Sequence, residues 1–169
     1  MADFQVSFEK MIISEGGYRL TDIPGDRGQQ TYAGIARKPN PQWMGWSYVD
    51  RGETPPSDLV RGFYRESFWE PIRGDSIMRQ DIADSLFSFA VNAGTGTAIK
   101  LAQIVVGATP DGKVGAKTLM AINSMQAEIF RPAFSLAKIA RYYNICRKDK
   151  SQRVFLMGWL ARTLNDASQ

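Results

Sequence analysis

Apolar residues recur at helical spacing along most of this chain. The first run begins after Asp3, a residue type that caps helix N-termini, and stops at Gly16-Gly17. Its apolar members lie three or four residues apart: Phe4, Phe8, Met11 and Ile12. This pattern predicts a first helix with Glu15 in its last turn.

The segment after this helix has a different composition. Residues 18–50 are rich in glycine, proline and turn-forming residues, which predicts long loops or a small hairpin rather than helix. Apolar periodicity returns after the cap at Ser57-Asp58, where Leu59, Phe63 and Phe68 share one face. Further helices are predicted at Ile82 to Gly94, Thr97 to Val106, Val114 to Asn123, Ala127 to Cys146 and Gln152 to Leu164. The chain is therefore predicted to be mainly α-helical.

Length and composition indicate one folded unit. The 169 residues are 44% hydrophobic and 22% charged, as in ordinary globular proteins, and no linker separates domains cleanly. The single Cys146 excludes an internal disulfide, and the N-terminus lacks the features of a signal peptide. No apolar run approaches the ~20 residues of a membrane span. We expect synthesis in the bacterial cytoplasm and a separate route, such as a holin, to any site of action outside it.

The absence of histidine limits the chemistry. Hydrolases of the Ser-His-Asp and Cys-His types need an imidazole, and most zinc peptidases bind their metal through histidine. These classes are excluded, and we expect no metal and no cofactor. Acid/base chemistry falls to carboxylates, with a Ser-Lys pair as the remaining alternative.

Glu15 is the first candidate for such chemistry. A general acid must hold its proton near neutral pH, and apolar neighbours and the carbonyls at a helix C-terminus both favour the protonated form. A glutamate followed by Gly-Gly is also often just a solvated residue beside a helix cap. From its local sequence alone, both interpretations of Glu15 stay open.

A longer motif surrounds Glu15. It reads Glu15-Gly16-Gly17-Tyr18, then Asp22 and Asp26-Arg27-Gly28, then Thr31-Tyr32-Ala33-Gly34-Ile35. This segment resembles phage-type lysozymes, and more closely glycoside hydrolase family 108. The motif glutamate is taken as the catalytic acid in that family, so the resemblance assigns this role to Glu15.

The resemblance extends over nearly the whole chain. Residues 63–69 and 89–94 look like later segments of the same family. The motifs at 111–115 with Thr118, at 141–143 and at 158–162 look like its accompanying peptidoglycan-binding region. The resemblance implies one lysozyme-like domain over 1–169, with a long loop or small hairpin after the first helix. Within it, 1–94 would be the catalytic glycosidase part and 95–169 a helical peptidoglycan-binding part packed on it.

The second carboxylate is Asp26 or Asp22. In related phage lysozymes an aspartate precedes a Gly-x-x-Thr element, which Gly28-Gln29-Gln30-Thr31 supplies here, and Asp26 is the nearest preceding acid. We prefer Asp26, although either aspartate could be an ordinary turn residue. Thr31 could position an attacking water or orient a carboxylate, or be a plain turn or strand residue.

Several other side chains are candidates for substrate binding. Aromatic rings can stack on sugars, although they more often pack in cores. Asn92, at the end of an apolar helix, could bind an N-acetyl group or cap that helix. The predicted substrate-binding residues are Tyr18, Asp22, Tyr32, Trp43, Trp46 and Asn92.

The net charge of +4 is concentrated late in the chain, from Arg141 to Arg153. This basic part could attract anionic envelope polymers or could be a solvated helix face. We expect bacterial peptidoglycan as the partner, with no nucleic acid and no integral membrane segment.

These observations together predict an endolysin, a phage or prophage lysozyme with antimicrobial action. The expected reaction is muramidase cleavage between N-acetylmuramic acid and N-acetylglucosamine, with Glu15 as general acid. A lytic transglycosylase acting on the same bond, and a non-catalytic protein that binds peptidoglycan or assists secretion, are the alternatives. The sequence leaves open whether the reaction retains or inverts configuration, and it does not identify the host or the oligomeric state.

Overall fold

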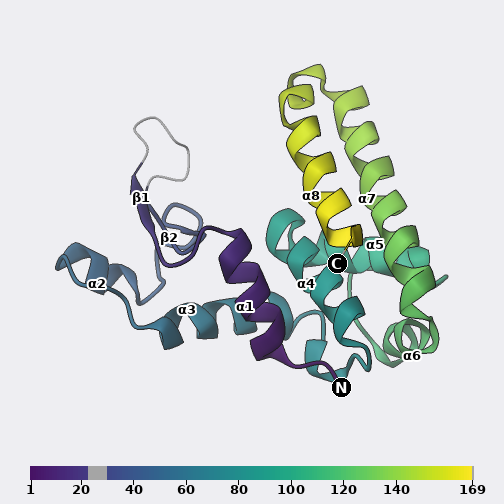
Figure 1. Ribbon diagram of the computed structural model, residues 1–169, viewed down its shortest axis with the longest axis horizontal. Coiled ribbons are helices and arrows are strands. Elements are labelled where there is room, and N and C mark those ends of the chain that lie inside the picture. Colours follow the sequence, from purple (N-terminus) through teal and green to yellow (C-terminus); the bar gives the residue numbers. More distant parts are fainter. Residues whose placement is uncertain (23–29, 169) are drawn as a thin grey trace.

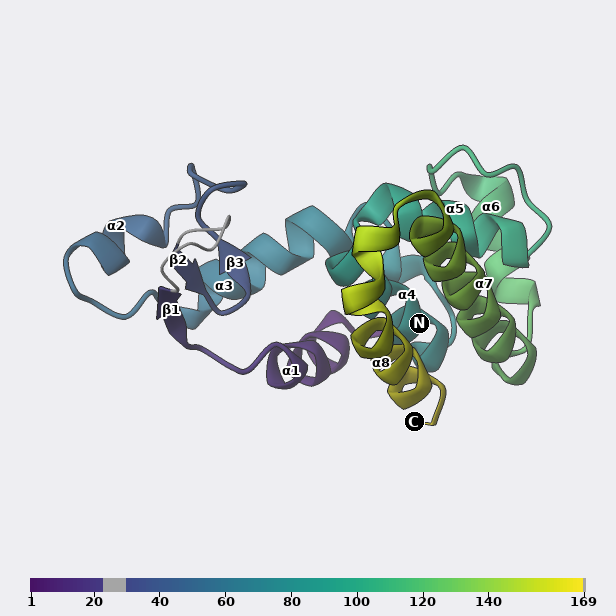
Figure 2. The same cartoon turned by 90° about the horizontal axis from the view of Figure 1, so that it is seen from above.

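The computed structural model describes residues 1–22 and 30–168 and is mainly α-helical, as predicted. Its α-helices are α1 (Phe4–Ser14), α2 (Trp46–Asp50), α3 (Ser57–Tyr64), α4 (Gln80–Ala93), α5 (Thr95–Val105), α6 (Ala116–Ser124), α7 (Ala127–Lys148) and α8 (Leu156–Ser168). Its strands are β1 (Leu20–Asp22), β2 (Gln30–Tyr32) and β3 (Ile35–Ala36). The sheet and α2 lie at one end of the molecule, α5, α6 and α7 at the other, and α1 and α3 between them (Figures 1 and 2). No helix among the described residues is long and apolar enough to cross a membrane.

Helix α1 forms as its apolar spacing predicts. Asp3 caps it by accepting a 2.8 Å hydrogen bond from the backbone N–H of Gln5. Its buried face carries Phe4, Phe8, Met11 and Ile12, and full burial of each such side chain stabilises the fold by ~2 kcal/mol. The helix ends where Gly16 and Gly17 adopt positive φ angles of 89° and 76°, which suit glycine. The chain then turns directly into the sheet.

The sheet is antiparallel, in the order β1-β2-β3. Leu20 pairs with Tyr32, Thr21 with Thr31, and Asp22 with Gln30, so residues 23–29 connect two neighbouring strand ends. The turn between β2 and β3 contains Ala33 and Gly34, both with positive φ. Two successive left-handed residues are typical of a tight hairpin turn.

Helix α3 is extended by a π-helical turn over Arg65–Trp69. Here the backbone N–H of Glu70 donates to the carbonyl of Arg65 at 2.9 Å, five residues earlier. Tyr64 and Trp69 are therefore brought to the same side of the helix, and both are fully buried. The ring of Tyr64 lies 5.9 Å from that of Phe8, which packs α3 against α1.

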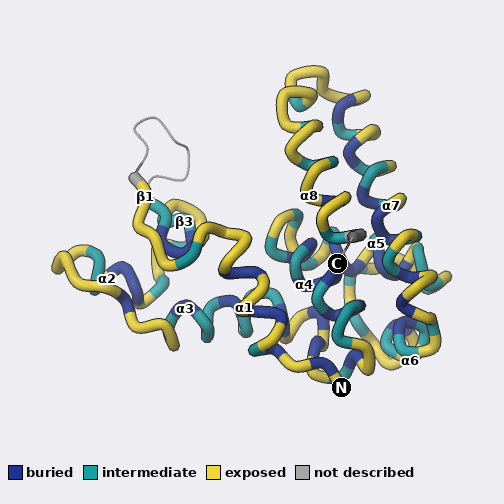
Figure 3. The backbone as a smooth tube through the Cα atoms, in the orientation of Figure 1, coloured by how far each residue is buried: buried dark blue, intermediate teal, exposed yellow. Residues whose placement is uncertain are grey.

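The C-terminal helices surround a second aromatic group. Phe89 of α4 meets Phe134 of α7 edge to face at 5.6 Å, and Phe134 stacks on Phe130 at 5.2 Å. Helices α7 and α8, joined by a 3-10 turn at Lys150–Phe155, form a hairpin that projects from the rest of the protein. Buried residues follow α1, α3, α4 and α7, whereas the outer end of this hairpin is exposed (Figure 3).

The structure differs from the prediction in two regions. Residues 18–50 were expected to hold loops or a small hairpin, and they also contain the short helix α2, whose buried Trp46 provides the core contact. The last helix begins at Leu156 rather than near Gln152, because a 3-10 turn occupies the preceding residues. Local sequence does not distinguish a 3-10 turn from the first turn of an α-helix.

Candidate active site

Glu15 lies at the point where α1 meets the sheet. Its backbone N–H donates to the carbonyl of Met11 at 3.0 Å, which ends the helix, and its side chain is exposed. A Cβ atom placed on Gly34 would be 3.6 Å from both Cβ and Oε2 of Glu15. The carboxylate is therefore held beside the β2–β3 turn while it stays open to solvent.

Gly34 is required by this arrangement. It has a φ of +79°, and an added Cβ would overlap the hydroxyl of Tyr64. Glycine lets the backbone of the turn pass close to both side chains.

Tyr64, the last residue of α3, contacts the same turn. Its buried hydroxyl donates a 2.9 Å hydrogen bond to the carbonyl of Ala33. Burial, and secondly the negative charge of Glu15, raise the pKa of Tyr64 above its ordinary value of 10.0. Tyr64 is therefore a neutral hydrogen-bond donor across the physiological range, and its position links α3 to the turn beside Glu15.

Thr31 lies in the middle strand, between Thr21 and Ala36. It is half-buried, and because successive strand residues point to opposite faces, it lies on the face opposite Tyr32. No described residue hydrogen-bonds to its hydroxyl; its carbonyl accepts from Thr21 Oγ1 at 3.3 Å. Thr31 is thus a half-buried residue of the middle strand, in the same sheet as the β2–β3 turn that adjoins Glu15.

The two candidate aspartates are placed differently in the chain. Asp26 lies outside the described residues, as do Arg27 and Gly28. The backbone of Asp22 pairs with Gln30 at the end of β1, and its side chain is not described. Both aspartates therefore belong to β1 or to the connection between β1 and β2.

The predicted aromatic ligands mostly pack against one another. Trp43 stacks on Tyr32 at 6.0 Å and meets Trp46 edge to face at 5.1 Å. The indole N–H of buried Trp46 donates to the carbonyl of Asn40 at 2.8 Å, and that of half-buried Trp43 to the carbonyl of Leu59 at 3.2 Å. Both tryptophans therefore have packing partners within the protein, and their predicted role in sugar binding stays a prediction.

Tyr18 and Tyr32 differ in exposure. Tyr18 is 43% exposed, whereas Tyr32 is 4% exposed and its hydroxyl has no hydrogen-bond partner among the described residues. Burial, and secondly Tyr18, raise the pKa of Tyr32. Both rings line a pocket of about 270 Å³ together with Leu20, Val49, Glu53 and Pro55. Tyr18 is the predicted aromatic side chain that is free to meet a ligand.

Asn92 is already engaged on both sides of its amide. Its Nδ2 donates to the carbonyl of Ser88 at 2.8 Å, and its Oδ1 accepts a hydrogen bond from Arg162 of α8. The side chain is exposed at the end of α4. In this structure Asn92 joins the end of α4 to α8.

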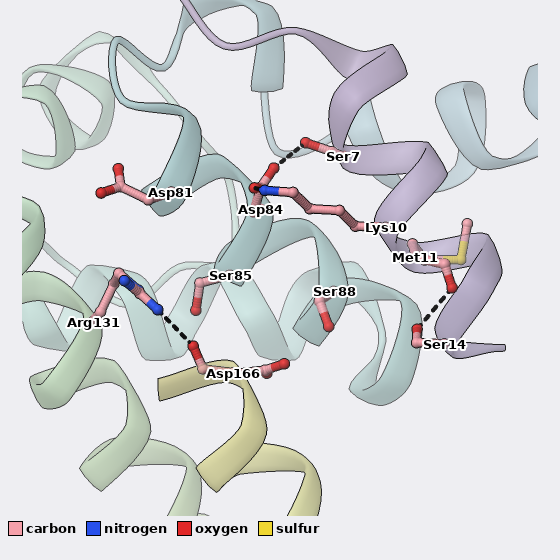
Figure 4. Close-up of a pocket in the computed structure, with 10 residues that line it drawn as sticks. All are labelled: Ser7, Lys10, Met11, Ser14, Asp81, Asp84, Ser85, Ser88, Arg131 and Asp166. Atoms are coloured by element: carbon pink, nitrogen blue, oxygen red, sulfur yellow. Dashed lines mark hydrogen bonds and ion pairs between the residues drawn. The ribbon is translucent and has the colours of Figure 1, made fainter. Parts of the chain in front are cut away.

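A second pocket lies along α1, next to Ser14, the residue before Glu15 (Figure 4). It has a volume of about 110 Å³ and is lined from α1, α4, α7 and α8. Lys10 pairs with Asp84 at 2.5 Å, and Ser7 donates to the same carboxylate at 2.6 Å. Across the pocket, Arg131 donates to the carbonyl of Asp166 at 2.8 Å. These bonds join α1 to α4 on one side of the pocket and α7 to α8 on the other.

Lys138 and Asp166 form the most buried ion pair among the described residues. Lys138 is 1% exposed, and its Nζ lies 3.0 Å from Asp166 Oδ2 and 4.8 Å from the ring centre of Phe134. Burial lowers the pKa of Lys138, and Asp166 opposes this change. The sequence contained no signal for this pair, because the two residues lie on different helices. No described cluster of acidic, cysteine or histidine side chains could hold a metal ion.

The fold and the site together define a lysozyme-like protein, in which an exposed glutamate ends the first helix beside a small sheet. Residues 8–94 match the family glycosyl hydrolase 108, and residues 97–164 match the family described as a predicted peptidoglycan domain. The chain belongs to the glycosyl hydrolase 108 family, as its sequence motifs predicted. It is a glycosidase that acts on peptidoglycan.

A solved structure has a similar overall fold. SagA of Brucella abortus is similar to this chain, with a TM-score of 0.74 and 26% sequence identity. The similarity covers 98% of this chain and 91% of SagA. No curated protein matches the sequence.

Proposed function

We propose that the protein is an N-acetylmuramidase that cleaves peptidoglycan between N-acetylmuramic acid and N-acetylglucosamine. The observation that carries this proposal is the position of the Glu15 carboxylate, which is exposed at the end of α1 and lies against the Gly34 turn. A general acid must reach the glycosidic oxygen from a fixed position, and two structural elements meet at Glu15 to provide one.

In the proposed mechanism, Glu15 protonates the departing glycosidic oxygen as the C–O bond breaks. The second carboxylate, which we assign to Asp26 in preference to Asp22, activates water or stabilises the oxocarbenium-like transition state. Thr31, whose hydroxyl no described residue occupies, orients this water or carboxylate from the strand that follows the Asp26 segment. The protein contains no histidine, so both proton-transfer roles fall to carboxyl groups.

The proposed substrate contacts surround this centre. Tyr18 is the exposed aromatic ring on the sheet side and is suited to stacking on a sugar face. The peptidoglycan-domain match over 97–164 supports a polymeric wall substrate that extends beyond the bond being cleaved.

The test is hydrolysis of purified peptidoglycan by the wild type and by Glu15→Gln, with mass spectrometry of the released fragments. New reducing ends, formed by the wild type and lost in Glu15→Gln, support a muramidase. Products ending in anhydro-muramic acid would instead identify a lytic transglycosylase, in which a sugar hydroxyl replaces water. Binding to sacculi with no cleavage by the wild type would contradict both reactions.

Glu9→Gln is the matched control for this experiment. Glu9 is an exposed glutamate on the same helix, and its carboxylate accepts only from the side chain of Gln5 among the described residues. The control makes the same change of charge about a turn and a half away from the proposed centre. Equal activity losses in the two variants would show that charge on α1, rather than the acid at position 15, limits the rate.

A further inference from the structure

The outer end of the α7–α8 hairpin has a surface that the proposed hydrolase activity does not use. We call residues 147–157 the hairpin tip; they comprise the end of α7, the 3-10 turn and the start of α8. The tip projects away from the sheet and from α1 (Figure 1), and its backbone is mostly exposed (Figure 3). The tip is therefore the part of the hairpin best placed to contact a large surface such as a membrane or a wall.

Three large apolar side chains of the tip are open to solvent. Val154 and Met157 are each 75% exposed, and Phe155 is 54% exposed. Phe155 stacks on Trp159 at 5.9 Å, and Trp159 stacks on Tyr142 at 5.1 Å, so the turn is supported by a column of rings. Large apolar side chains that are exposed next to one another mark a surface that binds a partner.

The charges around these apolar side chains are mostly positive. Arg147, Lys148, Lys150 and Arg153 are exposed, and none pairs with an acid among the described residues. Asp149 is the one acid between residues 141 and 162, and its carboxylate accepts from the N–H and hydroxyl of Ser151 at 2.9 and 2.7 Å. The tip thus offers four unpaired positive charges to an anionic partner.

We propose that the hairpin tip docks on an anionic phospholipid surface. The side chains of Val154 and Met157 have no ring to stack on a glycan, and the ring of Phe155 already stacks on Trp159, whereas all three apolar side chains fit the apolar boundary of a bilayer. The surrounding lysines and arginines match negatively charged headgroups. A second copy of the chain is disfavoured as the occupant, because two tips of equal positive charge repel one another.

This contact is peripheral and does not cross the membrane. One short apolar turn binds a bilayer weakly, and the basic residues add the second attraction that stable interfacial binding requires. The proposal goes beyond the hydrolase function and does not depend on Glu15. Docking would place the enzyme at the membrane face next to the wall that it degrades.

The experiment measures sedimentation of the full-length protein with vesicles of phosphatidylglycerol and phosphatidylethanolamine, compared with vesicles of phosphatidylcholine alone. We expect binding to the anionic vesicles and about tenfold weaker binding to neutral ones at low salt. Raising the salt toward about 1 M should remove most of the difference, because it screens the headgroup charge. Equal binding to both vesicle types would overturn the proposal.

Two sets of variants locate the contact. Val154→Ser with Met157→Ser should weaken binding to anionic vesicles about tenfold, because two apolar side chains that would be buried in the bilayer are lost. Lys148→Gln with Lys150→Gln and Arg153→Gln should weaken it similarly and flatten its dependence on salt. The matched control is Met44→Ser with Met78→Ser, which changes two exposed methionines elsewhere on the protein, at 71% and 65% exposure.

Hydrolysis of purified, lipid-free peptidoglycan is the second measurement. All tip variants should keep the wild-type rate and circular dichroism spectrum, which separates this proposal from failure of the muramidase proposal. If the tip variants bind anionic vesicles as tightly as the Met44→Ser, Met78→Ser control does, the proposal is contradicted. If the tip variants lose binding to sacculi but keep binding to vesicles, the tip contacts the wall. If the molecular mass of the wild type rises with concentration and that of the tip variants does not, the tip mediates self-association. Either outcome overturns membrane docking.

Discussion

The hydroxyl of Tyr64 donates a 2.9 Å hydrogen bond to the carbonyl of Ala33, across 31 residues of sequence. This bond fixes the turn whose next residue, Gly34, lies beside the carboxylate of Glu15. Tyr64 is itself held by packing against Phe8 of α1. The helix that carries the proposed acid and the turn that adjoins it are therefore positioned by the same buried side chain.

Gly34→Ala should destabilise the protein and displace Glu15. The new Cβ would overlap the Tyr64 hydroxyl and require a positive φ, so we expect a loss of about 3 kcal/mol in the free energy of unfolding and a clear loss of activity. Gly52→Ala is the control, because its φ is +72° but nothing lies within 4 Å of the added atom. That variant should lose only about 1 kcal/mol. Urea denaturation of both proteins measures the difference, and equal losses would contradict the overlap.

Tyr64→Phe should cost about 1 kcal/mol of stability, because it removes the hydrogen bond to the buried turn. In the Gly34→Ala background the same change removes the overlapping hydroxyl. The double variant should therefore be more stable than the sum of the two single losses predicts. A strictly additive result would show that the hydroxyl and the turn do not interact as the structure indicates.

The stability of the wild type should fall at high pH because of Tyr64. Burial raises its folded-state pKa above the unfolded value of about 10, so above that pH the unfolded chain binds fewer protons than the folded one. The stabilisation is complete below pH ~10 and is lost as the pH rises toward the folded-state pKa, by about 1 kcal/mol per pH unit. Comparing urea midpoints at pH near 8 and near 11, Tyr64→Phe should lose less stability than the wild type. Identical pH profiles would contradict this assignment.

Asp26→Asn should lower the rate of peptidoglycan cleavage by about a hundredfold or more if Asp26 is the second carboxylate. Asp22→Asn, which changes the neighbouring acid of the same segment, should lower it by less than about tenfold. Release of reducing ends measures both rates, and thermal melts show whether each variant folds. The reverse order of losses would assign the role to Asp22.

Asp166→Asn should destabilise the C-terminal hairpin by about 2–3 kcal/mol, because it leaves the buried ammonium of Lys138 without its counter-charge. Adding Lys138→Met removes that charge and should recover much of the loss. Asp58→Asn, which breaks an exposed pair with Arg61, should change stability by less than about 1 kcal/mol. Urea unfolding distinguishes them; an Asp166→Asn protein as stable as Asp58→Asn would show that the pair does not anchor α8.

Parts of the fold could be predicted because their signal is local. The spacing of Phe4, Phe8 and Met11 predicted α1, and the helix predicted from Ala127 to Cys146 occurs as Ala127–Lys148. The π-helical turn after Tyr64 was not predictable, because it serves to bury Trp69 on the same side as Tyr64 against other elements. The sequence could not show whether Trp43 and Trp46 pack in the core or bind a sugar, because burial depends on which distant residues pack against them.

The sequence by itself determined the helical character of this protein, the exclusion of histidine-based chemistry, and the position of Glu15 at the end of the first helix. These properties follow from residue types and from spacing within a few turns. Only the tertiary structure decided that Gly34 and Tyr64 adjoin Glu15, that Lys138 is buried against Asp166, and that Val154 and Met157 are exposed. These contacts join residues that are far apart along the chain, and exposure depends on which distant elements pack against a residue. Both are therefore set only when the chain folds.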